Sequence, residues 1–129
     1  MEREFFAAMA NGSVTYKGDE VSSGAGAWCA HPSLKGVYLK SLITGEKTEG
    51  ALSAHVVRIE PNCTLEQHAH QGQWELHEVV GGDGFLEFSG ASYPYHMGRM
   101  AVIPQGEDHS VTAGDAGLML LAKFFPALV

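Results

Sequence analysis

The sequence contains few basic residues and no long hydrophobic run. Its 129 residues include 8 Lys and Arg against 15 Asp and Glu, a formal net charge of −7. This charge repels the phosphate groups of nucleic acids and anionic lipids. No run approaches the roughly 18 apolar residues of a membrane-spanning helix. We therefore expect neither nucleic acid nor a membrane surface among its partners.

The cysteines and the start of the sequence exclude further classes of protein. Cys29 and Cys63 lie far apart and form no CxxC pair, so neither a disulfide framework nor a cysteine-bound zinc site is indicated. The opening stretch has an acidic residue at position 2 and an apolar run of only Phe5 to Ala10, unlike a secretory signal. We expect a cytoplasmic protein with free thiols and one domain over residues 1–129.

Glycine is abundant, and short apolar runs lie between the glycines. The 16 glycines separate segments rich in Val, Ile, Leu, Tyr and Phe, a pattern typical of an all-β protein. A hairpin is predicted with strands at about 37–43 and 51–59, joined by residues 44–50. Further strands are predicted at 75–80, 84–88, around 93–96, 100–103, 109–112 and 117–125. Only residues 1–10 have helical spacing, so a closed barrel or a double-sheet jelly roll fits best.

The segment 117–125 differs from the other predicted strands because both of its faces are apolar. One face would carry Leu118, Leu120, Ala122 and Phe124, and the other Met119, Leu121 and Phe125. Such a strand needs either the N-terminal segment or another subunit against its outer face. A homodimer is the simpler arrangement, and we predict one.

Three of the seven histidines lie within ten residues, around a glutamate, in the stretch HAHQGQWELH at 68–77. Residues two apart on a strand share a face, so His68 and His70 can aim two neutral imidazoles at one point. Glu75 opens the next strand and can add an anionic oxygen. His77 lies two residues further along the same strand and therefore on the same face as Glu75. It is better placed to contact the ligands or a substrate than to bind the metal. The stretch predicts a metal site.

These spacings resemble the first motif of the cupin superfamily. That motif is Gly, five residues, His-x-His, three or four residues, Glu, six residues and Gly. The chain has His68, His70, Glu75 and Gly82 at those positions, with Asn62 in place of the first glycine. The departure concerns a turn and not a ligand.

The second cupin motif is Gly, five residues, Pro-x-Gly, two residues, His, three residues and Asn. The chain resembles it at Gly98, Pro104, Gly106 and His109, while Ala113 replaces the final Asn. The resemblance is to small, single-domain, RmlC-like cupins, with the motif region at about residues 60–125.

The resemblance implies a jelly-roll barrel, or double-stranded β-helix, that holds one divalent transition metal per chain. By resemblance, its ligands would be His68, His70, Glu75 and His109, with one or two positions open for water or substrate. Imidazole suits Fe, Mn, Ni, Zn, Co and Cu, so the metal stays open. Metal-free sugar-nucleotide epimerases of the same fold generally lack this complete set.

Glu75 and His77 are the candidate catalytic residues, although His77 could instead be a pocket histidine that only makes hydrogen bonds. His55 faces inward with Val57 and Ile59 on the predicted strand 51–59, and the same two alternatives apply to it.

Other residues near the predicted site have structural interpretations. Tyr93 and Tyr95 could line the cavity or simply pack in a strand. On a strand, the Trp74 side chain would point to the opposite face from Glu75, so we expect it to pack behind the site. His31 and His96 are interpreted as surface or packing residues without a role.

Two classes of function stay open, each with a small-molecule ligand or substrate. A metal enzyme could be dioxygenase-like, with Glu75 leaving the metal to take a proton, or isomerase- or lyase-like, with His77 or a tyrosine moving the proton. A non-catalytic cupin could instead serve as a sensor, store or accessory module. Titratable groups beyond the ligands would favour catalysis, and a closed site with apolar walls would favour storage.

Overall fold

The computed structural model describes residues 2–22 and 28–129, and within them it has two short helices and ten strands. The helices are α1 (Glu2–Ala10) and α2 (Gly45–Thr48). The strands are β1 (Ser13–Tyr16), β2 (Asp19–Ser22), β3 (Cys29–Ala30), β4 (Val37–Ile43), β5 (Ser53–Ile59), β6 (Thr64–His68), β7 (Trp74–Phe88), β8 (Ala91–His96), β9 (Met100–Ile103) and β10 (His109–Phe125). Neither helix in these described ranges is long and apolar enough to cross a membrane. The predicted all-β jelly roll is confirmed.

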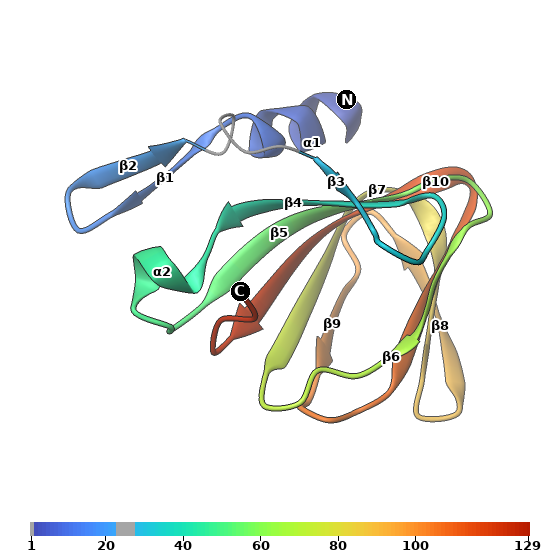
Figure 1. Ribbon diagram of the computed structural model, residues 1–129. Helices are drawn as coiled ribbons and strands as arrows, with labels where there is room; N and C mark the ends of the chain where they lie inside the picture. The colour runs from blue at the N-terminus through green and yellow to red at the C-terminus, as the bar shows by residue number, and fades with distance from the viewer. Residues whose placement is uncertain (1, 23–27) are drawn as a thin grey trace.

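Two long strands, β7 and β10, run through both layers of the jelly roll (Figure 1). The C-terminal part of β10 pairs with β5 and with the start of β7, and β4 and β9 extend this first layer. The N-terminal part of β10 pairs with β6 and with the end of β7, and β8 completes the second layer. The strands predicted at 75–80 and 84–88, and at 109–112 and 117–125, are therefore two bent strands rather than four separate ones.

Glycines allow both long strands to bend where they cross. Gly82 and Gly117 have φ angles of +77° and +76°, a region in which side chains other than glycine are strained. A Cβ atom at Gly82 would lie 2.1 Å from the carbonyl oxygen of Gly117. The β7–β10 register also shifts between Ala113 and Leu118, so the bend sits at a bulge between the two layers.

The main core lies between the layers and confirms the predicted inward faces. It includes Val57 and Ile59 of β5, and His55 of the same face is 6% exposed. The C-terminal part of β10 supplies the residues of its predicted inward face, Leu118, Leu120, Ala122 and Phe124. Alternating burial along these strands places one set of side chains in the core, as a period of two requires.

Helix α1 covers the outer face of the first layer (Figure 1). Phe6 and Ala10 are buried there with four residues of the sheet, Leu42, Val56, Val80 and Leu121. The N-terminal segment thus shields Leu121 and part of Met119, whereas Phe125 of the same face is 41% exposed. The predicted homodimer stays a prediction.

The hairpin formed by β1 and β2 and the helix α2 were not predicted. Lys17 and Gly18 have φ angles of 51° and 82°, as a two-residue hairpin turn requires. Helix α2 lies inside the predicted 44–50 connection and has only four residues, too few for a periodic signal. The prediction that only residues 1–10 are helical is therefore wrong at 45–48.

Candidate metal centre

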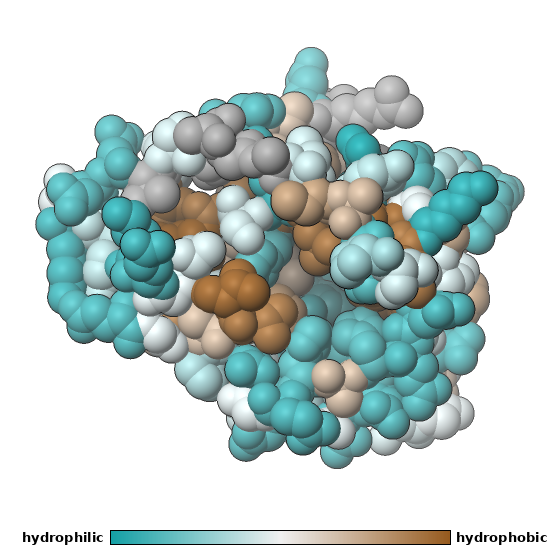
Figure 2. All heavy atoms as spheres, viewed as in Figure 1, coloured by the Kyte–Doolittle hydropathy of each residue, from teal (hydrophilic) through white to brown (hydrophobic). Residues whose placement is uncertain are grey.

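A cavity of about 580 Å³ opens between the two layers. The molecule is hollowed near the centre of the face shown in Figure 2, between β5 and β6 of Figure 1. Apolar side chains of three strands form much of the wall, with Leu39, Val57, Leu120 and Phe124 among them. Histidines, serines, Glu66, Gln67 and Glu75 supply polar groups, and no Lys or Arg of the described residues lines the cavity. The cavity can hold a small molecule with both apolar and polar parts.

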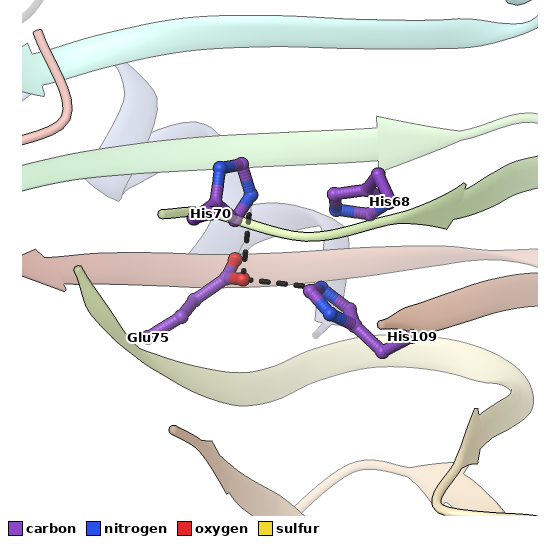
Figure 3. A group of neighbouring side chains, drawn as sticks. All are labelled: His68, His70, Glu75 and His109. Carbon is purple, nitrogen blue, oxygen red and sulfur yellow. Dashed lines mark ion pairs between the residues drawn. The ribbon is translucent and has the colours of Figure 1, made fainter. Parts of the chain in front are cut away.

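The four predicted ligands lie together (Figure 3). His68, His70 and Glu75 line one end of this cavity, and His109 is buried against them. His68 is the last residue of β6 and pairs with His109, the first residue of β10. Their rings have centroids 4.1 Å apart. Glu75 lies on β7, and His70 follows the end of β6 rather than lying on a strand. Turn geometry, and not strand parity, therefore aims the His70 imidazole at the other three side chains.

The ligand atoms of this cluster lie within 4.8 Å of one another. Glu75 Oε1 is 3.2 Å from His109 Nε2 and 3.7 Å from His70 Nε2 (Figure 3). Two bonds of about 2.1 Å on opposite sides of an ion span about 4.2 Å, so shifts of a few tenths of an ångström would close the cluster around one ion.

Backbone carbonyls fix the proton positions of two of these imidazoles. His68 Nδ1 donates to the carbonyl of Glu66 at 2.8 Å, and His109 Nδ1 donates to the carbonyl of Glu107 at 3.2 Å. In the neutral ring the other nitrogen, Nε2, then carries a free lone pair. Hydrogen bonds of this kind orient the histidine ligands of metals.

Two buried atoms of the cluster have no hydrogen-bond partner among the described residues, His109 Nε2 and Glu75 Oε1. A buried polar group left without a partner costs about 1–3 kcal/mol. A divalent cation between them would satisfy both. Three imidazoles and one carboxylate also match the donors that first-row transition metals take, so the cluster fits a metal site.

Burial and neighbouring charges set the protonation states. Burial lowers the pKa of His68 to about 4 and also lowers the pKa of His70. For Glu75 burial opposes ionisation, but His77 and His109 outweigh it and hold the pKa of the carboxyl well below its usual range. At neutral pH His68 and His70 are therefore neutral and the Glu75 carboxyl is ionised, the forms that bind metals.

His77 lies outside the group of four and contacts one of its members. Its Nε2 donates to Glu75 Oε2 at 2.7 Å, and its Nδ1 accepts from the hydroxyl of Tyr95 at 2.8 Å. Both side chains are almost fully buried. The position of His77 agrees with the expectation that it contacts a ligand. Sequence analysis left open whether Tyr95 lines the cavity or packs in a strand. It could not indicate the bond to His77, because the register partner of Tyr95 on β7 is Gly84.

His55 lies on another part of the cavity wall, between two serines. Its Nδ1 is 3.2 Å from Ser41 Oγ, and its Nε2 is 3.1 Å from Ser53 Oγ. Sequence analysis did not single out these serines, although the predicted hairpin of 37–43 and 51–59 would have placed Ser41 beside His55. The structure pairs these two residues across β4 and β5.

One expectation about a neighbouring residue is wrong. Trp74 is 46% exposed and does not pack behind the site, because β7 begins at this residue and its outer face is open there. His31, expected to be a surface or packing residue, lies at the cavity lining. Its Nδ1 accepts hydrogen bonds from the backbone amides of Ser33 and Leu34, both at 3.2 Å.

No family model matches the chain. The oxalate-binding protein of Thermotoga maritima is 27% identical over 67 residues, which are 51% of this chain and 55% of that protein. The chain thus spans about half the length of this curated relative.

Two solved structures match more of the chain. A predicted oxalate decarboxylase from Thermotoga maritima has a TM-score of 0.70 and 22% identity over 78% of this chain and 91% of that chain. An RmlC-like cupin from Shewanella frigidimarina has a TM-score of 0.69 and 19% identity over 81% of this chain and 86% of that chain. At these identities the likeness establishes the fold. The protein has a cupin fold, which confirms the resemblance found in its two motifs.

Proposed function

We propose that this protein is a mononuclear metal enzyme that acts on a small, oxygen-bearing metabolite. The observation that carries the proposal is a buried cluster of three histidines and one glutamate that faces a cavity with further titratable groups. His77 contacts the cluster directly, and His55 shares the cavity. Convergent titratable groups beyond the ligands are a feature of catalytic sites rather than of storage sites.

The ligands in this proposal are His68, His70, Glu75 and His109. A divalent ion held by them would supply a Lewis acid that polarises a substrate oxygen or activates a bound oxygen species. His77 holds Glu75 Oε2 by its Nε2–H, which leaves Oε1 directed at His70 and His109. The buried Tyr95 hydroxyl in turn holds His77 Nδ1. This chain of two hydrogen bonds fixes the carboxylate in one orientation.

Non-catalytic binding is the second candidate function. It is favoured by the curated relative, whose name describes it as binding oxalate, and by the apolar part of the cavity wall. In that case the same cluster would hold a metal and a small carboxylate without turnover.

The first test is metal analysis of protein purified without chelators and without a histidine-rich tag. We expect about one transition metal per chain, lost in His109→Ala and kept in the control His96→Ala, which changes an exposed histidine outside the cluster. Absence of bound metal after reconstitution would contradict the site.

Turnover then separates the two candidates. Metal-loaded protein would be screened for oxygen consumption and for conversion of small hydroxy and keto acids. Conversion that requires His109 supports the enzyme. Tight binding of such acids with no conversion of any of them supports the binding protein.

A further inference from the structure

A second polar group lies on the cavity wall, on strands β4 and β5, away from the metal cluster. It consists of Ser41, His55 and Ser53, and we call it the serine–histidine anchor. His55 is 6% exposed and Ser53 is fully buried, whereas Ser41 is open to the cavity. The proposed chemistry at the metal assigns no task to these three side chains.

Their hydrogen bonds leave one donor free. The backbone N–H of Leu128 donates to Ser53 Oγ at 2.9 Å. Among the described residues, the acceptor for the hydroxyl hydrogen of Ser53 is His55 Nε2 at 3.1 Å. Burial lowers the pKa of His55, so the ring is neutral and its single proton sits on Nδ1, which donates to Ser41 Oγ at 3.2 Å. The hydroxyl hydrogen of Ser41 then points to no described acceptor and can be donated into the cavity.

The strand register places this donor at a defined separation from the metal cluster. Ser41, His55, Ala122 and His77 are successive cross-strand neighbours on β4, β5, β10 and β7. Three strand spacings of about 4.8 Å make roughly 14 Å of backbone between Ser41 and His77, which contacts the ligand Glu75. Side chains narrow this span at both ends, and the Phe124 ring lies between those of His55 and His70.

The wall between the two ends is apolar and narrow. Ala122 leaves a shallow floor between His55 and His77. Phe124 lies two residues after Ala122 on the same face of β10. Its ring is 5.5 Å from that of His55 and 4.8 Å from that of His70. A carbon chain that lies over Ala122 would contact Phe124 along its side. Because no Lys or Arg lines the described cavity, the far end suits a neutral oxygen better than a second carboxylate.

We propose that the ligand spans from the metal cluster to Ser41, with a metal-binding carboxylate at one end and a carbonyl or hydroxyl oxygen at the other, several carbons away. This inference rests on the proposed metal site and adds the length and the second end of the substrate. Oxalate can reach only the metal. Its binding would not depend on Ser41.

The test compares ligands with and without the far oxygen. Protein loaded with Zn²⁺, which such sites bind more tightly than Mn²⁺ or Fe²⁺, is titrated calorimetrically with 4-oxopentanoate, 5-oxohexanoate and 6-oxoheptanoate. Pentanoate, hexanoate and heptanoate are the matched ligands without the carbonyl, and oxalate is the short ligand.

We expect at least one oxo acid to bind roughly three- to tenfold more tightly than its matched acid. Ser41→Ala removes this preference and leaves oxalate binding unchanged, and Ser41→Thr, which keeps a hydroxyl, restores it. Ser33→Ala is the control, because Ser33 also lines the cavity but hydrogen-bonds to His31 instead.

Two results would overturn the inference, and they differ. If the loaded protein binds oxalate but favours none of the oxo acids, or if Ser41→Ala keeps the preference, the anchor is wrong while the metal site stands. If elemental analysis finds no bound Zn²⁺ in the folded protein, both the metal site and the anchor fail.

Discussion

His77 Nε2 lies 2.7 Å from Glu75 Oε2 on the same face of β7, and this hydrogen bond fixes the orientation of the carboxylate. Glu75 and His77 share a face because side chains alternate along a strand, and the Tyr95 hydroxyl donates to His77 Nδ1 at 2.8 Å from the other side of the ring. A ligand held in place before the metal arrives binds it with less loss of side-chain freedom.

Tyr95→Phe should therefore weaken metal binding without removing a ligand. We expect the metal dissociation constant to rise roughly tenfold, the lower end of the effect of such supporting hydrogen bonds. Competition with a coloured chelator would measure it. Tyr93→Phe is the control, because Tyr93 is 42% exposed. Equal affinities of the two variants would show that the Tyr95 hydroxyl does not support the site.

Acid should destabilise the metal-free protein. Burial lowers the pKa of folded His68 to about 4 from its ordinary 6.5. Between these values the unfolded chain binds more protons than the folded one, so the free energy of unfolding falls as the pH drops from about 6.5 to about 4. His70 and His55, whose pKa values burial also lowers, act in the same direction.

Urea unfolding of chelator-treated protein from pH 4.5 to 7.5 would measure this slope. His68→Gln should flatten it, since the variant lacks a group that must stay neutral in the fold. His96→Gln, at an exposed position, should leave it unchanged. A His68→Gln slope equal to that of the parent protein would contradict the assignment.

Much of the fold could be predicted because the strands alternate clearly. The predicted boundaries of β4 and β9 match the structure, and the two cupin motifs placed four ligand-type side chains that the structure brings within 4.8 Å. The motifs record spacing along the chain, and spacing decides which side chains a jelly roll brings together. Whether these four residues bind a metal stays a prediction.

The parts that could not be predicted depend on contacts between distant segments. The bends in β7 and β10 lie where Gly82 approaches Gly117 closely. The local sequence does not distinguish a glycine at which a strand bends and continues from a glycine at which a strand ends. The bond between Tyr95 and His77 joins two strands away from their paired positions. Helix α1 covers Leu121. The sequence pattern did not decide between this helix and a second subunit, because either could shield the outer face of the strand.

The packing of α1 against the sheet can be tested with two adjacent phenylalanines. Phe6 is 6% exposed, and its ring stacks on Trp28 at 5.7 Å, whereas Phe5 is 51% exposed. We expect Phe6→Ala to lower the free energy of unfolding by about 3 kcal/mol through lost burial and a cavity. Phe5→Ala should change it by less than about 0.5 kcal/mol. Similar effects of both substitutions in urea unfolding would mean that α1 does not cover the sheet as described.

The crossing of the two long strands gives a last pair of matched substitutions. Gly82 and Gly90 both have φ angles of +77°, so alanine at either position meets the same backbone strain, about 1 kcal/mol. At Gly90 the added Cβ meets nothing within 4 Å, but at Gly82 it would lie 2.1 Å from Gly117 O. The added methyl group would separate β7 from β10 at their bulge and disturb both layers.

We therefore expect Gly82→Ala to lower the free energy of unfolding by roughly 3 kcal/mol or more, and Gly90→Ala by about 1 kcal/mol. Thermal and urea unfolding followed by circular dichroism would compare them. If the two variants lost equal stability, backbone strain alone would explain both, and the close approach at Gly117 would not be what requires glycine at position 82. A larger loss at Gly82 means that the bend joining the two layers depends on this contact, and with it the approach of Glu75 in the first layer to His109 in the second.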